Sequence, residues 1–364
     1  MLSAGALLTL DLDAVRANYR LLRQRAGAAT CGAVLKADAY GLGAAAVAPA
    51  LRREGCDTFF VAHLAEGTAL RGILGPGVTI IVMHGLFPGT EAEALRHDLV
   101  PVVNSTEQLR DWAAFARAQG RPLPAWLQID TGMARFGFSE GELEAAIAEA
   151  RDLGSLALRC VMSHLACADT PAHPANARQL AEFHRLRRKL PPLPTSLAAS
   201  SGIFLGPDWH GDTVRPGVAL YGVAPTEGQP NPLRPVLRLD AKVVQLREVA
   251  AGTPVGYGHT AVTARPSRLA TVAVGYADGF LRSASGRGVV RFRGLDLPIL
   301  GRVSMDSLVV DATVLPPGAM RAGDTVALIG EGNDLDRVGR AAGTIGYEIL
   351  TSLGHRYHRR TLGG

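Results

Sequence analysis

Long apolar runs are absent from this chain of 364 residues. A membrane-spanning helix needs about 18 or more consecutive apolar residues, whereas a run such as Val78–Met83 has only the length of a strand. We therefore expect no membrane span. The opening residues, 1–10, are apolar but include no basic residue, so we also expect no secretory signal and a cytoplasmic location.

Cysteine is scarce as well. The four cysteines, at positions 31, 56, 160 and 167, match the spacing of neither a zinc site nor a redox motif, and they are too few for a disulfide scaffold. We expect reduced and mostly buried thiols and no metal site.

Neither sign of charge dominates the sequence. Lysine and arginine together number 38 against 33 acidic residues, which leaves a formal net charge of +5. The arginines are scattered, and only Arg185–Lys189 forms a basic cluster, without the interleaved aromatic residues of a nucleic-acid-binding stripe. We therefore expect no nucleic-acid partner, whereas a site for small anions fits this charge.

The composition is otherwise typical of a folded globular protein. Apolar residues make up 47% and charged residues 20%, which argues against disorder and against a fibrous repeat. At about 150 residues per domain, the length predicts roughly two domains, or one large barrel with an addition.

Short β-branched runs alternate with longer amphipathic stretches between residues 11 and 222, as in βα units around a parallel sheet. The expected strands are Thr30–Lys36, Asp57–Ala62, Val78–Met83, Leu99–Val103, Pro124–Asp130, Ala157–Ser163, Thr195–Ala199 and Asp212–Tyr221. The expected helices between them include Gly43–Glu54, Thr106–Gln119, Glu140–Asp152 and Asn176–Leu190. This pattern matches a (β/α)8 TIM barrel better than an open doubly wound sheet. A helix with Leu12, Val15 and Tyr19 on one face is expected before the first strand.

A proline-rich segment, residues 225–235, cannot continue a helix and is typical of an interdomain linker. Beyond it, apolar and polar residues alternate between glycine and proline turns, as in a mostly antiparallel β domain. The expected strands are Val236–Val249, Arg268–Val274, Gly288–Phe292, Leu297–Val303, Leu308–Val310 and Thr325–Ile329, followed by a helical tail, Leu335–Leu353. We therefore expect a barrel over residues 9–230 and a β domain over residues 231–364, on which residues 1–8 are a candidate to pack.

Catalytic side chains of barrels lie where strands end and the following loops begin. Lys36 follows four apolar strand residues, and partial burial there lowers the pKa of a lysine and makes its neutral amine available as a Schiff-base nucleophile. A lysine whose ammonium group simply extends to solvent is an equally open interpretation of this segment alone. Tyr40 and the glycines after it are candidates to contact a phosphate.

Polar residues lie in or directly after four more of the expected strands. They are Arg135 after the fifth, His164 after the sixth, Ser201 after the seventh and Arg215 within the eighth. Small hydroxyl residues before a helical turn, as at Ser201, are suited to bind a phosphate. Each residue alone is ordinary, and a lone histidine is more often structural, but all are expected at the same end of the barrel.

These segments resemble the alanine racemase family, in the family's order and over nearly the whole chain. Residues 33–41, Ala-Val-Leu-Lys-Ala-Asp-Ala-Tyr-Gly, are similar to the family's signature around the lysine that binds pyridoxal phosphate. The resemblance implies that Lys36 is the Schiff-base residue and that Tyr40 contacts the cofactor's phosphate. It also implies a barrel plus a β domain, working as a homodimer whose active sites are shared between the subunits.

Two further barrel segments carry the resemblance. Residues 130–135 are similar to the segment whose arginine contacts the cofactor's phenolic oxygen and holds the substrate carboxylate, which implies this role for Arg135. Residues 214–217 are similar to the segment whose arginine meets the pyridine nitrogen, which implies this role for Arg215. The other implied cofactor contacts are His164, Ser201, Gly217, Val218 and Tyr347.

In the second domain, residues 255–260 resemble the stretch that carries the second catalytic base, which implies Tyr257 of the partner subunit. The resemblance places Met305 against the substrate, with Tyr276 and Asp306 as supporting residues near the entrance. The implied reaction is the interconversion of L-alanine and D-alanine by two bases, the lysine and the tyrosine, on the imine of substrate and pyridoxal phosphate. The implied role is peptidoglycan synthesis or alanine catabolism.

A free tyrosine has a pKa near 10, so Tyr257 needs nearby donors or positive charge to act as a base. We expect a hydrogen-bonded chain in which Arg215 keeps His164 neutral and His164 accepts a hydrogen bond from the phenol. Because a guanidinium cannot accept a proton, Arg215 is also expected to leave the pyridine nitrogen unprotonated.

Three residues depart from the family's pattern. Many members have a lysine, modified to a carbamate, where this chain has Gln128. An amide cannot be carbamylated, so Arg135 is expected to be oriented by the neutral amide, by a bound anion or by another group. Ser200 stands where asparagine is common, and Ser304 stands where cysteine is common, which weakens a cofactor contact and removes a reactive thiol.

Three other functions are open at this point. A racemase for serine, or one with broad specificity, differs only in a few loop residues that set substrate size. A non-catalytic pyridoxal-phosphate carrier on the same barrel has no need of a β domain that offers Tyr257 and Met305. A decarboxylase of basic amino acids has a similar architecture, but residues 255–258 favour the racemase.

Overall fold

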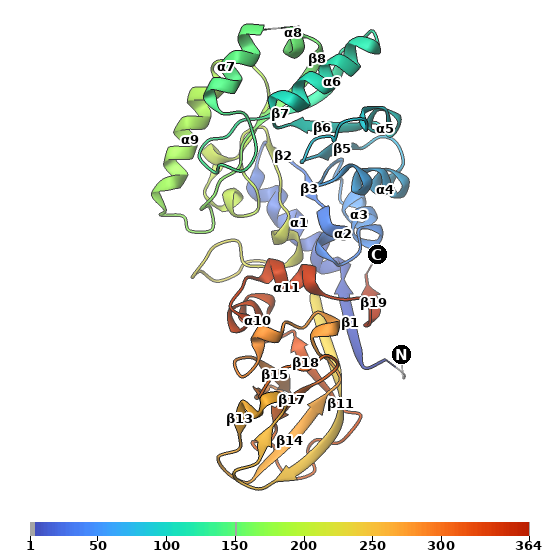
Figure 1. The fold of residues 1–364 in the computed structure, drawn as a ribbon, viewed down its shortest axis with the longest axis vertical. Coiled ribbons are helices and arrows are strands. Elements are labelled where there is room, and N and C mark those ends of the chain that lie inside the picture. Colours follow the sequence, from blue (N-terminus) through green and yellow to red (C-terminus); the bar gives the residue numbers. More distant parts are fainter. Residues whose placement is uncertain (1–3, 150, 364) are drawn as a thin grey trace.

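The computed structural model describes residues 4–149 and 151–363 of the chain. Figure 1 shows two bodies stacked along the long axis, with a sheet surrounded by helices in the upper part and a β domain in the lower part. Among the described residues, no helix is long and apolar enough to cross a membrane.

Seven strands form the main sheet of the barrel, and each pairs in parallel with the next along the chain. They are β3 (Ala33–Val34), β4 (Thr58–Val61), β5 (Thr79–Val82), β6 (Leu99–Val103), β7 (Leu123–Gln128), β8 (Leu156–Met162) and β9 (Thr195–Ser196). The short strand β10 (Thr213–Val214) pairs in parallel with β2 (Thr30–Cys31). On its other side, the N–H of Arg215 donates to the carbonyl of Ala198 at 2.9 Å. The ring of strands therefore closes, and the predicted barrel is confirmed.

The barrel strands are buried on both faces, which is why they are continuous apolar runs instead of alternating ones. Residues 59–61 of β4 and 80–82 of β5 are at most 1% exposed. The barrel helices are α1 (Leu12–Ala26), α3 (Ala44–Arg53), α4 (Leu64–Leu74), α5 (Glu91–Arg96), α6 (Thr106–Ala118), α7 (Glu140–Glu149), α8 (Arg151–Gly154) and α9 (Pro174–Arg187). Helix α1 precedes the first barrel strand, and its apolar face, Leu12, Val15 and Tyr19, is buried.

Three predicted barrel strands are wrong at their ends, and one of them, expected over 195–199, ends at Ser196. The strand expected over 212–221 ends at Val214, and Val218–Tyr221 form the 3-10 helix η3 instead. Pro216 has no N–H for a strand ladder, and the N–H of Gly217 donates to the hydroxyl of Ser200. The strand expected over 30–36 ends at Val34, because the chain turns before Lys36.

The β domain is an eight-stranded sheet in the order β14-β17-β16-β15-β18-β11-β1-β19. Its strands are β1 (Ala6–Asp11), β11 (Leu237–Val249), β14 (Ser267–Val272), β15 (Val289–Phe292), β16 (Leu295–Leu300), β17 (Leu308–Asp311), β18 (Thr325–Ile329) and β19 (His358–Leu362). β1 pairs antiparallel with β11 and parallel with β19, so both ends of the chain join this sheet. β11 also pairs with β14, which closes the domain on itself, and β12 (Pro254–Val255) and β13 (Ala261–Val262) form a separate hairpin.

Two expectations for the second domain need correction. The strand expected over 297–303 ends at Leu300, because Gly301 turns the chain at a φ of +68°. The expected helical tail is two helices, α10 (Leu335–Ala342) and α11 (Gly346–Ser352). Gly343, at a φ of +72°, ends the first of them in the left-handed conformation.

Asn18 of helix α1 holds the end of the barrel to the linker. Its side chain donates to the carbonyls of Leu220 at 3.2 Å and Arg234 at 2.9 Å, and it accepts from the N–H of Arg234 at 2.7 Å. Because Asn18 is 1% exposed, water cannot replace these bonds.

We predict that Asn18→Ala lowers the free energy of unfolding by about 2–4 kcal/mol, because three buried bonds lose a partner. Urea denaturation checks this. The exposed Gln24 on the same helix provides the control, since Gln24→Ala is expected to stay within about 0.5 kcal/mol. Equal midpoints for the two variants would contradict the role of Asn18.

Candidate active site

Lys36 opens a left-handed helical turn at the carboxyl end of the first barrel strand. The turn is labelled α2 (Lys36–Tyr40) in Figure 1, and Ala37, Asp38, Ala39 and Tyr40 have φ angles of +52° to +56°. None of these four residues is glycine, and the left-handed conformation costs roughly 1–2 kcal/mol for each such residue. The turn therefore persists only because its surroundings hold it.

The environment of Lys36 favours the neutral amine. Partial burial of the side chain and the positive charge of Arg135 lower the pKa of Lys36, while the negative charge of Glu66 raises it. The Nζ atom lies 5.9 Å from the ring centroid of Tyr40. The structure thus places Lys36 in a partly desolvated position and not on an open surface.

Sequence reasoning missed Glu66, which lies at the start of helix α4. Its Oε1 accepts from the N–H of Ala37 at 2.7 Å, and its Oε2 accepts from the N–H groups of Ala62 at 2.8 Å and His63 at 3.1 Å. The available signal was a glutamate three residues into a helix, where a carboxylate closes a capping box. The bond to Ala37, 29 residues away, had no signal in the sequence.

Arg215 is a buried cation without an acidic partner. It is 2% exposed, and no carboxylate of a described residue forms an ion pair with it. Its guanidinium donates to the carbonyl of Ser163 at 2.7 Å and to the hydroxyl of Ser196. Burial lowers the pKa of Arg215 to about 10, so the group stays charged at neutral pH.

The Nδ1 atom of His164 lies 3.4 Å from Nη2 of the Arg215 guanidinium. Burial and then the charges of Arg215, Arg135 and Lys36 lower the pKa of His164 to about 3, so the ring is neutral. A guanidinium only donates, so Nδ1 must accept and the proton of the neutral ring must sit on Nε2. On this tautomer the outward Nε2 is a donor, whereas the predicted bond in which His164 accepts from the phenol of Tyr257 requires the opposite tautomer.

Three hydroxyl groups near the carboxyl ends of the barrel strands have no hydrogen-bond partner among the described residues. The ring of Tyr40 lies 4.9 Å from that of Tyr221 and 6.4 Å from that of Tyr347, which α11 brings from the other domain. The hydroxyls of Tyr40, Tyr347 and Ser201 form no hydrogen bond with another described residue. Free donors at the edge of a barrel are suited to bind an anion.

Ser200 and Gly217 set the conformation of the backbone beside these hydroxyls. Ser200 is buried, and its hydroxyl accepts from the N–H groups of Gly217 at 2.9 Å and Ala219 at 3.2 Å. The N–H of Val218, between them, has no acceptor among the described residues. A Cβ atom at Gly217 would collide with the hydroxyl of Tyr40, so only glycine fits there.

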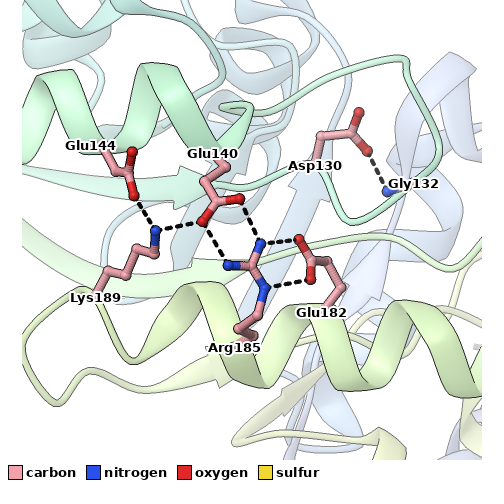
Figure 2. A network of polar contacts seen from close by, with 7 residues as sticks. All are labelled: Asp130, Gly132, Glu140, Glu144, Glu182, Arg185 and Lys189. Carbon is pink, nitrogen blue, oxygen red and sulfur yellow. Dashed lines mark hydrogen bonds and ion pairs between the residues drawn. The ribbon is translucent and has the colours of Figure 1, made fainter.

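Arg135 lies on the loop after β7 and is exposed. Asp130 organises this loop, since its carboxylate accepts from the N–H of Gly132 at 2.9 Å (Figure 2). It also accepts from the N–H groups of Met133 at 2.9 Å and Ala134 at 3.0 Å. Gln128 is buried, but its amide forms no hydrogen bond with a described residue and so does not brace Arg135.

The basic cluster Arg185–Lys189 lies outside this site. Figure 2 shows Arg185 between Glu140 and Glu182, with ion pairs of 2.6 and 2.7 Å, and Lys189 against Glu140 at 2.5 Å. The cluster therefore joins helices α7 and α9 across the barrel surface.

Of the β-domain residues of the predicted site, Tyr347 joins the barrel residues, whereas Tyr257 stays apart from them within one chain. Tyr257 is 72% exposed, and the adjacent hairpin strand β13 lies far from β3 in Figure 1. The N–H of Tyr276 donates to the carbonyl of Ser304 at 3.0 Å, which places Tyr276 beside the exposed Met305. Asp306 pairs with Arg356 at 2.7 Å.

We predict that Asp130→Ala loosens the loop that carries Arg135, because three N–H groups lose their acceptor. Amide hydrogen exchange over residues 132–134 is expected to speed up at least about tenfold. Unchanged exchange would show that other contacts hold the loop.

We predict that the His164 ring stays neutral in the folded protein between pH 5 and 8, since its pKa is lowered to about 3. The unfolded value is about 6.5, so the unfolded chain binds a proton first and stability is lost as the pH falls from about 6.5 toward 3. The ring carbon shifts of His164, followed by NMR against pH, test this. A midpoint near 6.5 would contradict the burial argument.

Comparisons with known proteins identify the family. Residues 10–225 match the model of the alanine racemase N-terminal domain, and residues 236–361 match that of the C-terminal domain. The chain is 52% identical to the catabolic alanine racemase of Mesorhizobium japonicum, over 100% of this chain and 94% of that protein. It is 49% identical to the catabolic alanine racemase of Agrobacterium fabrum, over 98% of this chain and 92% of that protein.

Solved structures agree with this assignment. The alanine racemase of Bartonella henselae, which contains covalently bound pyridoxal phosphate, is 43% identical with a TM-score of 0.95, over 99% of this chain and 100% of that chain. The biosynthetic alanine racemase of Pseudomonas aeruginosa is 39% identical with a TM-score of 0.92, over the same shares of the two chains. The resemblance noted in the sequence is thereby confirmed, and this chain belongs to the alanine racemase family.

Proposed function

We propose that this protein is an alanine racemase that uses pyridoxal phosphate to interconvert L-alanine and D-alanine. The observation that carries the proposal is the presence of two unusual cationic groups at the carboxyl ends of barrel strands, both acting on His164. Lys36 is a partly buried lysine on a strained turn, and Arg215 is a buried guanidinium without an acidic partner. A structural lysine or a structural arginine has no need of such surroundings.

The donors left free in the site fit this cofactor. Tyr40, Tyr347, Ser201 and the N–H of Val218 would hold the phosphate, because none of them has another partner among the described residues. Arg215 would face the ring nitrogen. Lys36 would provide the amine for the covalent bond to the protein. When bound, pyridoxal phosphate withdraws electrons from the α-carbon of the amino acid and makes its proton removable.

Two bases on opposite faces of the α-carbon are needed, because racemisation removes a proton from one face and returns one to the other. Lys36 serves one face, and its lowered pKa raises the fraction of neutral amine at neutral pH. Tyr257 of the partner subunit serves the other face. It is exposed on the β domain and so is free to enter a second copy's barrel.

His164 and Arg215 prepare the tyrosine for this task. With Nδ1 of His164 facing the guanidinium, its Nε2–H would donate to the phenol oxygen of Tyr257. A donor stabilises the phenolate and lowers the pKa of a tyrosine toward neutral pH. Arg215 cannot accept a proton, so it leaves the ring nitrogen of the cofactor unprotonated and limits side reactions such as transamination.

Arg135 would hold the carboxylate of alanine, since its guanidinium is exposed and unpaired among the described residues. Met305 would border the small side chain of the substrate, and Tyr276 and Asp306 would line the way in. This arrangement requires a homodimer. Turnover of serine relative to alanine measures how strictly the site selects the smaller side chain.

We also propose a catabolic role. The identity to the two relatives named catabolic, 52% and 49%, exceeds the 39% to the structure named biosynthetic. In a catabolic role the gene is induced by alanine, and its deletion slows growth on alanine without creating a need for D-alanine. A D-alanine requirement in the deletion strain would instead assign the enzyme to peptidoglycan synthesis.

We predict that two inactive variants, Lys36→Ala and Tyr257→Ala, restore activity when co-expressed. A hybrid dimer contains one intact site out of two, so the hybrid isolated through two different tags is expected to have about half of the native activity, and an unfractionated random mixture about a quarter. Purification through two different tags, followed by detection of D-alanine formed from L-alanine, checks this.

The matched control is a double variant that carries both changes in one chain, co-expressed with a Lys36→Ala chain. None of these pairs contains an intact site, so no activity is expected. Inactive hybrids from the first mixture would contradict a site shared between subunits. Tyr257→Phe with native rates in both directions would contradict the second base.

A further inference from the structure

We propose that Glu66 is a positioning residue for Lys36. Its carboxylate holds the backbone of the turn that follows the lysine, and so fixes the direction in which the Lys36 side chain enters the barrel mouth. This inference rests on the proposed function, because it assigns Glu66 to the lysine that the function depends on.

The carboxylate joins the ends of two neighbouring strands. Oε1 accepts from Ala37, directly after Lys36, at 2.7 Å, and Oε2 accepts from Ala62 and His63, directly after β4, at 2.8 and 3.1 Å. β3 and β4 are paired neighbours in the barrel sheet. Glu66 therefore sets the position of one strand end relative to the other.

The turn needs this contact because the N–H of Ala37, directly after Lys36, has no partner within the turn. The N–H of Ala39 donates to Leu35 and that of Gly41 donates to Ala37, whereas the N–H of Ala37 donates only to Glu66. The far end of the turn has its own anchor, since the guanidinium of Arg359 donates to the carbonyl of Gly41 at 2.8 Å. Glu66 is thus the anchor beside the lysine.

Glu66 also supplies the negative charge that Lys36 experiences. The charged or titratable groups coupled to Lys36 are Arg135, His84, His164 and Glu66. Burial and Arg135 favour the neutral amine, and Glu66 opposes them. A change at Glu66 that keeps the fold should therefore make Lys36 easier to deprotonate.

Three variants separate positioning from simple folding. Glu66→Gln removes the negative charge and one of the two accepting oxygens. The variant therefore cannot keep both the hydrogen bond from Ala37 and the hydrogen bonds from Ala62 and His63 at the start of the helix. Glu66→Asp keeps a carboxylate for the helix cap but is too short to reach Ala37 as well. Glu142→Gln is the matched control, since Glu142 caps α7 by accepting from the N–H of Ser139 at 2.9 Å.

Two measurements use the protein without cofactor and need no activity. Amide exchange over residues 37–40 is expected to speed up at least about tenfold in both Glu66 variants. The rate of Lys36 acetylation by acetic anhydride is then followed against pH. The chain has only three lysines, at positions 36, 189 and 242, so peptide mass spectrometry assigns each site.

The third measurement uses the enzyme saturated with pyridoxal phosphate. In Glu66→Gln, kcat for L-alanine is expected to fall about a hundredfold, because a small misplacement of a reacting group is costly, while KM changes less than about threefold. The acetylation midpoint of Lys36 is expected to move to lower pH. Glu142→Gln is expected to leave all three readouts unchanged.

Any of three results would overturn the proposal. The first is native amide exchange at residues 37–40 in both Glu66 variants, and the second is a native kcat in Glu66→Gln. The third is an acetylation midpoint of Lys36 that rises toward that of a solvated lysine, because this rise means that the turn has unfolded.

Failure of the proposed function looks different. In that case the native protein forms no D-alanine, while the exchange and acetylation results still test Glu66.

Discussion

Three cationic side chains, Lys36, Arg135 and Arg215, surround His164 at the mouth of the barrel. None of them forms an ion pair with a described carboxylate. Burial is the main cause of the lowered pKa values of His164 and Lys36, and this positive charge lowers them further. The positive charge also fits the proposed ligands, because a phosphate and a substrate carboxylate are both negatively charged.

The acidic residues near the site bind backbone instead of neutralising these cations. Glu66 accepts from the N–H next to Lys36 and from two N–H groups after β4, and Asp130 accepts from three N–H groups just before Arg135. In each case the chain next to the cation is in the left-handed region, at Ala37 and at Ala134. The carboxylates therefore hold strained loops in place and leave the cations free for ligands.

The sequence predicted the alternation of strands and helices well, because burial on both faces makes the barrel strands apolar throughout. It could not predict the left-handed turn, since Lys36-Ala-Asp-Ala-Tyr40 contains no glycine and only contacts from distant segments hold it. For the same reason Glu66 was missed. The direction of a hydrogen bond between His164 and Tyr257 could not be predicted from the sequence either, because it depends on which ring nitrogen faces Arg215.

Borohydride reduction of the protein saturated with pyridoxal phosphate, followed by peptide mass spectrometry, tests the central claim most directly. The account predicts that the pyridoxyl group is fixed on Lys36, that Lys189 and Lys242 stay unmodified, and that formation of D-alanine stops as Lys36 is modified. A folded protein that takes up no cofactor, or that carries the label on another lysine, would contradict it.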